Sequence, residues 1–475
     1  MSTKLEPGRR YHCQQLTDGR RPTGVFCCDP DSMGVKLFDY EEFFHLEEGA
    51  PVYLRLEDNL VVSMLDTVAS GPGRSSYLWE PQATTYFAEI SANTVVSGHK
   101  PWQPANPIRS VMFRVPHAKA LLYNRERLRA AQGRRFPPKA ASDPLFEVTV
   151  AGMVFKCWYS LSGSFEFGTN DWEPLFEIEF EEPRTLKTYL DPVHSLLQFF
   201  SAGAGLQLTP KDITISPQSH AEWLAAIEED KHTDENYSVV YLWKPAEVEK
   251  HDLHVRNSFF MAYKAADLVA LKGCLRAWLS RDDDWAKATA LMMGSLGLVR
   301  QVSGQRLLMA CRWLEAIPGG RAERALDDKQ LAVILKAAEE AAQAQGCRDL
   351  GRRIAGSLRS IKRESNEARF LRLVGSVVTV FGTKAFEPLP SGRNIVSTLV
   401  RAMRLRGQEA HSYIEGSDGE EVADLMASTA ALEALCYLLT LKDLPIDEAG
   451  RDRALHSRMV RTYHYAEMAF PPVKN

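Results

Sequence analysis

The hydrophobic period of this chain changes near its middle, and that change limits the folds open to it. Before about residue 245, apolar and polar residues alternate in short runs, which is the period of β-strands. After about residue 255, apolar residues recur at three- and four-residue spacing, which is the period of helices. A charged segment at 244–254, which carries Pro245, separates the two patterns. We therefore predict an α+β multidomain protein, with an antiparallel β-rich, sandwich-like domain at 1–245 and an all-α domain at 255–475.

The first half contains short β-type runs with no long helical crossovers between them. This favours a sandwich or a strongly curved antiparallel sheet over a doubly wound one. Two runs at 52–56 and 60–64 flank a short turn and predict a hairpin. Strict alternation at 176–181 predicts a half-buried strand with its carboxylates towards solvent. The other predicted strands are 84–90, 110–115, 146–150, 154–160 and 237–243, with one helix at 185–200.

The second half predicts a succession of amphipathic helices. Asp327 and Asp328 can cap one of them, and Gly346 can end it. The predicted helices cover residues 257–280, 284–317, 327–345, 347–381, 395–402, 422–441 and 447–468.

Composition narrows the class of protein. A net charge of −4 gives no overall basicity, so any nucleic-acid surface must be local. Residues 1–19 lack the apolar region of a secretory signal, and no uninterrupted apolar run reaches the roughly 18 residues that cross a bilayer. Eight cysteines are scattered without CxxC pairs. We expect a cytoplasmic protein with no membrane partner, no metal and no cofactor.

One segment is strongly basic. Residues 345–410 carry thirteen Lys or Arg against five acids, a local balance of +8. On a helix, five of these cations share a sector of about 100°, apart from an apolar stripe. This predicts an RNA-binding face whose affinity falls with salt, although a merely solvated helix face gives the same pattern. The five residues are Arg348, Arg352, Arg359, Lys362 and Arg363.

Arg406 and His411, with four residues between them, are candidates for metal-independent RNA cleavage. Arginine stays charged and can form bidentate hydrogen bonds to phosphate oxygens, while histidine exchanges protons near neutral pH. On a regular helix His411 lies about 140° from Arg406 but only about 20° from Arg404. Either Gly407 breaks the helix and brings Arg406 round, or Arg404 is the working arginine. The four-residue gap favours Arg406, and Arg404 remains an alternative.

These features resemble a known family. Arg406 and His411, followed by the amphipathic helix at 422–441, resemble the end of an Apea-like HEPN domain, whose signature is Arg, four to six residues, then His. Three blocks in the first half resemble the β-rich domain of ApeA-type anti-phage proteins, in the same order. The blocks are residues 90–99, 110–115 and 176–186.

The resemblance implies an endoribonuclease that acts in phage defence by abortive infection and needs no cofactor. Two HEPN domains would form a homodimer with a composite site, and tRNA is an expected target. Arg406 would bind phosphate and His411 would position or deprotonate the ribose 2′-hydroxyl. The family often has Asn directly after the arginine, whereas Gly407 here supplies no side chain.

Two other classes of function stay open at this stage. The β-rich domain can be a sensor that binds a phage-derived trigger, with the helical half as a dimerisation module that no longer cleaves. Alternatively, the chain is an RNA-binding protein that never cleaves RNA. Toxicity on expression that His411→Ala relieves would favour the nuclease over both.

Overall fold

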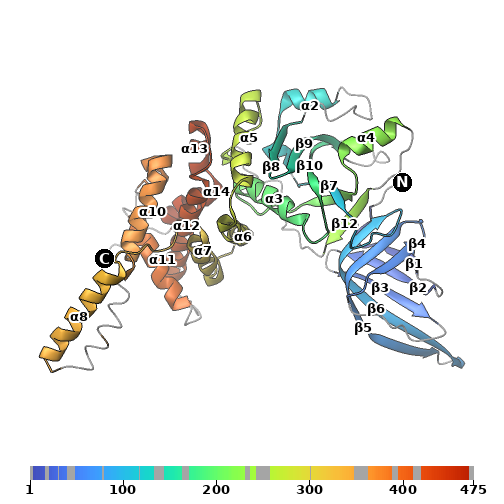
Figure 1. The fold of residues 1–475 in the computed structure, drawn as a ribbon, viewed down its shortest axis with the longest axis horizontal. Helices are drawn as coiled ribbons and strands as arrows, with labels where there is room; N and C mark the ends of the chain where they lie inside the picture. Colours follow the sequence, from blue (N-terminus) through green and yellow to red (C-terminus); the bar gives the residue numbers. More distant parts are fainter. Residues whose placement is uncertain are drawn as a thin grey trace. The chain divides into compact units, whose positions relative to one another are not determined.

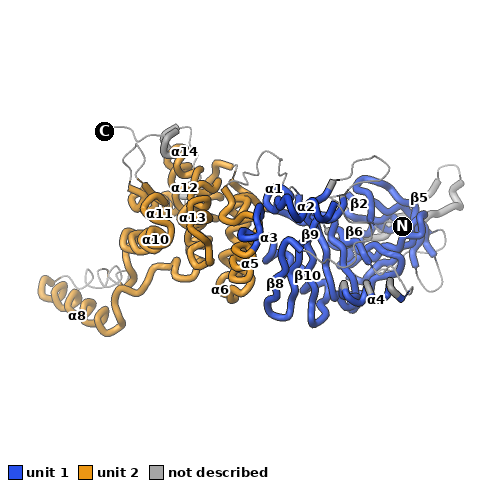
Figure 2. Tube along the Cα trace, turned by 90° about the horizontal axis from the view of Figure 1, so that it is seen from above, with its two compact units in different colours: residues 1–197, 208–248, 262–268 blue, residues 198–207, 249–261, 269–475 orange. Residues whose placement is uncertain are grey.

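The computed structural model describes most of the chain as two compact units. The first consists of residues 1–197, 208–248 and 262–268, and the second of 198–207, 249–261 and 269–475 (Figure 2). The predicted domain boundary at 245–255 lies outside the described residues. Those residues are 4–16, 21–29, 32–39, 49–77, 80–116, 118–132, 144–162, 171–229, 236–241, 257–299, 301–346, 353, 362–387, 394–409 and 419–469.

Six antiparallel strands of the first unit close on themselves. They pair in the order β3-β2-β1-β4-β5-β6, and a further β3–β6 pairing completes the ring (Figure 1). Inward residues such as Phe26, Leu37 and Met64 are fully buried and form one apolar core. The strands are β1 Arg10–Gln15, β2 Thr23–Asp29, β3 Ser32–Asp39, β4 Val52–Leu56, β5 Val61–Tyr77 and β6 Glu80–Gly98.

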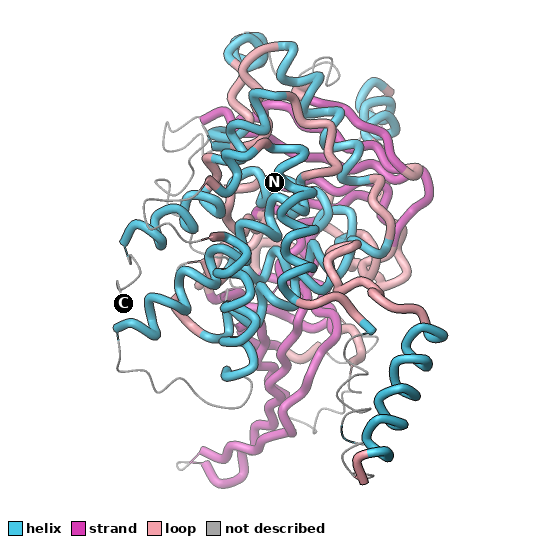
Figure 3. Tube along the Cα trace, turned by 90° about the vertical axis from the view of Figure 1, so that its left-hand side faces the viewer, coloured by secondary structure: helices cyan, strands magenta, loops and turns pink. Residues whose placement is uncertain are grey.

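The sheet continues beyond β6 as an open antiparallel extension. Its order is β6-β12-β11-β7-β10-β9-β8. The long β5 and β6 run together as a ribbon (Figure 3). The added strands are β7 Ile108–Arg114, β8 Phe146–Val150, β9 Met153–Ser162, β10 Asp171–Arg184, β11 Lys211–Ser216 and β12 Tyr237–Tyr241. Helices α1 Ala118–Leu121, α2 Arg125–Gln132, α3 Leu190–Ala204 and α4 His220–Glu228 accompany them.

The antiparallel β-rich prediction is confirmed, but its sandwich-like form is wrong. The described strands make one continuous sheet, because β6 belongs both to the closed ring and to the extension. The predicted hairpin is confirmed: β4 pairs with β5, and Asn59 takes a positive φ of 65° in the turn. The first three strands were not among the predicted runs.

The half-buried prediction for residues 176–181 is wrong at Glu177, whereas Glu179 is partly exposed and Glu181 is exposed. Phe176, Ile178 and Phe180 are buried as expected, but Glu177 on the opposite face is only 1% exposed. Strand β10 lies inside the sheet, between β7 and β9, and α1 contacts it. Alternation gives the two faces of a strand, but it does not say whether the polar face meets solvent.

The second unit is helical. Its described elements are α5 Ala265–Leu279, α6 Asp283–Gly297, α7 Gly304–Ala316, α8 Asp328–Ala344, α10 Asn366–Phe381, the short 3-10 helix η5 Thr383–Phe386, α11 Ile395–Glu409, α12 Gly419–Leu441, α13 Glu448–Leu455 and α14 Arg458–Ala469. The predicted ends of α8 are confirmed: Asp327 forms a capping box with Gln330, and Gly346 takes a φ of 73° after the helix.

Three predicted helices are shorter than expected. The helix predicted at 284–317 is two helices, and the second begins at its N-cap Ser303. The helix predicted at 347–381 cannot be continuous, because α10 starts at Asn366 with Ser365 as its N-cap. The helix predicted at 447–468 is interrupted at His456, which ends α13 before α14 begins. In each case the apolar spacing continues across the break, whereas the helix does not.

Helix α12 is the core of the second unit. It contacts α7, α10, α11 and α14, and its residues from Ala427 to Leu441 are buried on all sides. Within the described residues, one stretch, 422–441, has the length and composition of a membrane span, with a mean hydropathy of 1.5. Most of that stretch is buried among the other helices, as in the core helix of a folded domain.

Candidate functional site

The end of α11 carries both candidate arginines. The helix runs unbroken from Ile395 through Gly407 to Glu409, so the hypothesis that Gly407 breaks it is wrong. A side chain at Gly407 would meet no atom of the described residues within 4 Å, so their packing does not require a glycine here. His411, the predicted catalytic histidine, lies outside the described residues.

Arg406 is fixed by an acidic partner from a distant helix. Its Nη1 donates a hydrogen bond to Oε1 of Glu315 on α7, and the two side chains are 33% and 37% exposed. Partial burial opposes the charge of Arg406, but the hydrogen bond and the charge of Glu315 outweigh burial and raise the pKa of Arg406. The sequence offered no signal for this pair, because 91 residues separate its members.

Arg404 has a different environment two residues earlier. It is exposed, and it forms none of the ion pairs found between described residues. Leu405, between the two arginines, is 6% exposed and anchors this turn of α11 in the core. The structure therefore separates the two arginines that spacing alone left as alternatives: one is held by a carboxylate, and the other faces solvent.

The predicted cationic face is described only at its end. Arg348, Arg352 and Arg359 lie outside the described residues. Lys362 donates to Asp328, with Nζ 2.7 Å from Oδ1, and its backbone carbonyl accepts from the amide of Ala325. Arg363 is exposed, and its backbone pairs with Arg324 in an isolated antiparallel bridge. These two cations precede α10, so they do not share a helix with its residues.

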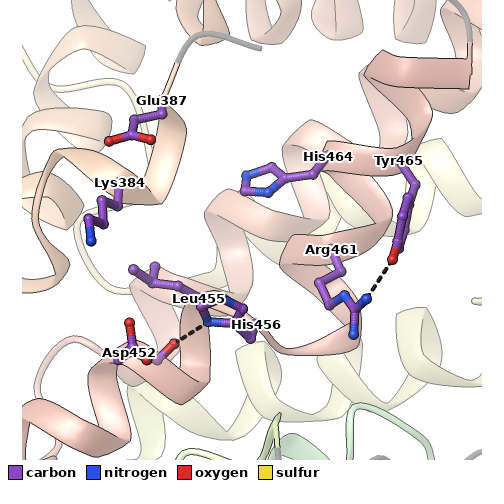
Figure 4. Close-up of a pocket in the computed structure, with 8 residues that line it drawn as sticks. All are labelled: Lys384, Glu387, Asp452, Leu455, His456, Arg461, His464 and Tyr465. Atoms are coloured by element: carbon purple, nitrogen blue, oxygen red, sulfur yellow. Dashed lines mark hydrogen bonds between the residues drawn. The ribbon is translucent and has the colours of Figure 1, made fainter. Parts of the chain in front are cut away.

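A pocket of about 440 Å³ collects titratable side chains elsewhere in the helical unit. Lys384 and Glu387, from and just after η5, lie on one side, and His464 of α14 lies across from them (Figure 4). The other lining residues are Asp452, Leu455, His456, Arg461 and Tyr465. Sequence reasoning missed this site, although the run from 456 to 465 holds two histidines, two arginines and two tyrosines.

The two histidines of the pocket differ in their hydrogen bonding. His456 Nδ1 lies 2.9 Å from the carbonyl oxygen of Asp452. Because a carbonyl oxygen only accepts hydrogen bonds, Nδ1 carries a proton, and Nε2 takes no part in this hydrogen bond. Burial lowers the pKa of His464, as does the charge of His456, while the Ala385 backbone and Glu387 raise it to a smaller extent. His464 Nε2 is buried without a hydrogen-bond partner among the described atoms.

On the far side of the pocket, Arg461 and Tyr465 form a pair. The Arg461 guanidinium lies over the Tyr465 ring, 5.3 Å from its centroid, and its Nη2 donates to the tyrosine hydroxyl. Tyr465 is nevertheless 53% exposed. The pocket thus has a rigid, amphipathic wall opposite Lys384.

Comparison of the chain with protein-family models found no match, and comparisons with curated proteins and with solved structures found none either.

Proposed function

We propose that this chain is a metal-independent endoribonuclease of the HEPN type, with its active site at the C-terminal end of α11. The observation that supports this most is the contrast between Arg404 and Arg406 immediately before His411. One arginine is exposed, and the other is held by Glu315. A phosphodiester-cleaving site needs both a cation that meets the phosphate and a rigid support for it.

In this proposal, Arg404 binds the phosphate. Among the described residues Arg404 has no ion-pair partner for a phosphate to displace, whereas a phosphate at Arg406 must displace the carboxylate of Glu315. This assignment uses the six-residue spacing to His411, which the HEPN signature also allows, in place of the four-residue spacing that favoured Arg406. Arg406 becomes a positioning residue, because its ion pair ties the last turns of α11 to α7.

His411 supplies the proton chemistry. Cleavage by the ribose 2′-hydroxyl requires removal of its proton, stabilisation of charge on the phosphorane and return of a proton to the 5′-oxygen. Histidine has an ordinary pKa of about 6.5 and can serve in either proton transfer. The bond from phosphorus to the 5′-oxygen breaks as the bond to the 2′-oxygen forms. The products carry a 2′,3′-cyclic phosphate and a 5′-hydroxyl.

The proposal includes a homodimer through the helical unit. One copy supplies one His411 and one Arg404, and a two-fold partner supplies the second of each. Acid, base and charge clamp then come from the same composite site. The resemblance to ApeA-type proteins supports a role in anti-phage defence, with RNA, and tRNA in particular, as the substrate. The β-rich unit is the part that would respond to a phage-derived trigger.

The test is an RNA cleavage assay with matched variants. Purified wild type, His411→Ala, Arg404→Gln and Arg406→Gln are incubated with total tRNA in EDTA, and new RNA ends are mapped. We expect cyclic-phosphate ends from the wild type, none from His411→Ala, and at least a hundredfold loss for Arg404→Gln, in the range of a lost charge-stabilising donor. Lys336→Gln, an exposed change on α8, is the control.

Each outcome bears on a separate part of the proposal. Full activity in Arg404→Gln with none in Arg406→Gln would mean that Arg406, and not Arg404, binds the phosphate. If the wild type leaves RNA intact, both alone and after addition of extract from phage-infected cells, the proposed nuclease activity is wrong. A monomer at micromolar concentration by light scattering would remove the composite site.

A further inference from the structure

The pocket lined by Lys384, His456 and His464 is well suited to a ligand. Its volume of about 440 Å³ lies within the range of roughly 300–1,000 Å³ for small-molecule sites. It is formed by η5, α13 and α14 of one unit, and the break between α13 and α14 puts His456 at its edge. None of its residues has a role in the function proposed for α11.

The fixed charges of this pocket nearly cancel. Lys384 and Arg461 contribute two positive charges, and Glu387 and Asp452 contribute two negative ones. An anion therefore gains little net attraction until a histidine takes up a proton. Burial keeps His464 neutral by lowering its pKa, and its Nε2 has no hydrogen-bond partner among the described atoms. A negative group that enters the pocket favours the protonated form of the His464 ring.

A phosphate monoester matches this set of donors. It presents three strong acceptor oxygens and about two negative charges near neutral pH. Lys384 offers an ammonium from one side, and the His464 ring lies across from it (Figure 4). His456 also lines the pocket, and its Nδ1 donates to the Asp452 carbonyl. Tyr465, backed by Arg461, gives a flat surface for the rest of the ligand.

We propose that this pocket binds a phosphate monoester group and that binding is coupled to protonation of His464. The charged groups that face His464 are His456 from the end of α13, Lys384 and Glu387 from η5, and Asp452, Arg461 and Tyr465 around the pocket. The phosphate dianion adds its negative charge to that of Glu387 and Asp452, which favours the protonated form of His464. The site is separate from His411, so this inference does not depend on the proposed nuclease.

The test is calorimetric titration of the full chain with four probes. They are inorganic phosphate, ribose 5-phosphate, a 5′-phosphorylated trinucleotide and the same trinucleotide with a 5′-hydroxyl. Measurement at one pH in two buffers of different ionisation enthalpy gives the protons taken up on binding. We expect binding of the phosphorylated probes with uptake of up to about one proton, and weaker binding of the hydroxyl probe. The tightest phosphorylated probe identifies the source of the group.

Variants of the lining residues show whether the phosphate binds in this pocket. Lys384→Gln is expected to weaken the phosphorylated probes about tenfold, the effect of one lost charge-assisted hydrogen bond. His464→Gln is expected to remove the proton uptake, and comparison with wild type at the same pH cancels the titration of the ligand itself. Lys336→Gln is the control and should bind as wild type. The circular-dichroism spectra of all variants verify that they fold.

Three results would overturn the proposal. The first is no binding of any phosphorylated probe at millimolar concentration. The second is binding that Lys384→Gln and His464→Gln leave unchanged. The third is equal affinity for the phosphorylated and hydroxyl trinucleotides, because a site for the monoester must distinguish them.

Discussion

Arg306 and Glu433 form a bidentate ion pair in the interior of the helical unit. Arg306 Nε donates to Glu433 Oε1 at 2.9 Å and Nη2 donates to Oε2 at 2.6 Å, and the Glu433 side chain is 1% exposed. Burial raises the pKa of Glu433, and Arg306 lowers it to a smaller extent. The pair joins α7 to the core helix α12, and a third guanidinium hydrogen bond goes to the Gln301 carbonyl.

Removing one member of this pair should destabilise the helical unit strongly. We expect Glu433→Gln to lower the free energy of opening α12 by about 3–5 kcal/mol, because Arg306 is then a buried charge without its partner. Hydrogen exchange of α12 amides, followed by mass spectrometry, measures this. Arg401→Gln, which removes the exposed pair with Asp424, is the control and should cost at most about 1 kcal/mol.

The double variant Arg306→Met with Glu433→Met should be more stable than Glu433→Gln alone. Removing both charges eliminates the unpaired buried cation, and apolar side chains suit the interior of α12. A double variant that is less stable than the single one would mean that the pair itself stabilises the bundle.

Glu177 should make the β-rich unit less stable as pH rises. Burial raises the pKa of Glu177 to about 8, with Glu179 adding to the shift and Lys156 opposing it. Between pH 4.5 and about 8 the folded state holds a proton that the unfolded state has released, so the free energy of unfolding falls with rising pH. The loss at pH 9 is at most about 5 kcal/mol, from 1.36 kcal/mol per pKa unit.

Glu177→Gln tests this dependence. The variant should lack the loss at high pH and should be more stable than wild type at pH 9. Exchange of β9 and β10 amides, compared between variant and wild type at each pH, gives the difference directly. Glu147→Gln, at an exposed position of β8, is the control. An unchanged pH slope in Glu177→Gln would contradict the assignment of the proton to this residue.

Ser303→Ala should cost about 1 kcal/mol in the stability of α7. Ser303 is an extended N-cap whose side chain accepts from the amide of Arg306, and loss of such a cap costs about 0.5–2 kcal/mol. Asp282 caps α6 without a side-chain hydrogen bond, so Asp282→Ala is the matched control and should cost less. Equal costs in local hydrogen exchange would mean that the Ser303 hydrogen bond contributes nothing.

Glu315→Gln should show whether the Arg406–Glu315 pair positions a catalytic group or only stabilises the end of α11. Both members of the Arg406–Glu315 pair are about one-third exposed, so the stability cost should stay within about 1 kcal/mol. If Arg406 positions the site, kcat for RNA cleavage falls while KM changes little. Glu340→Gln, on the exposed face of α8, is the control. A fall in stability with unaltered kcat would make Glu315 a structural residue only.

Local pattern predicted the period of each half, the β4–β5 hairpin and the caps of α8, because each depends on residues close in sequence. It did not predict the breaks at Ser303 and His456, where apolar spacing continues while the helix axis changes. It also missed the burial of Glu177 and the Arg406–Glu315 pair. Both depend on which distant elements come together, and alternation and spacing carry no information about that.

The same limit applies to the candidate sites. Spacing drew attention to Arg404, Arg406 and His411, but only tertiary contacts distinguish a solvent-facing arginine from a paired one. The phosphate pocket joins Lys384 to residues near 456–465 through packing of η5 against α10 and of α13 against α14. No short motif spans that distance along the chain.

The closed pairing of β1 to β6 also affects how this protein meets other chains. A strand whose two sides are already bonded cannot accept a foreign strand, so the ring resists both aggregation and recognition by strand addition. Among the described strands, β8 ends the sheet with one side unpaired. It is only five residues long and turns Glu147 outward, two features that discourage indiscriminate pairing. Within the described part of the chain, β8 is therefore one edge at which a protein partner can extend the sheet.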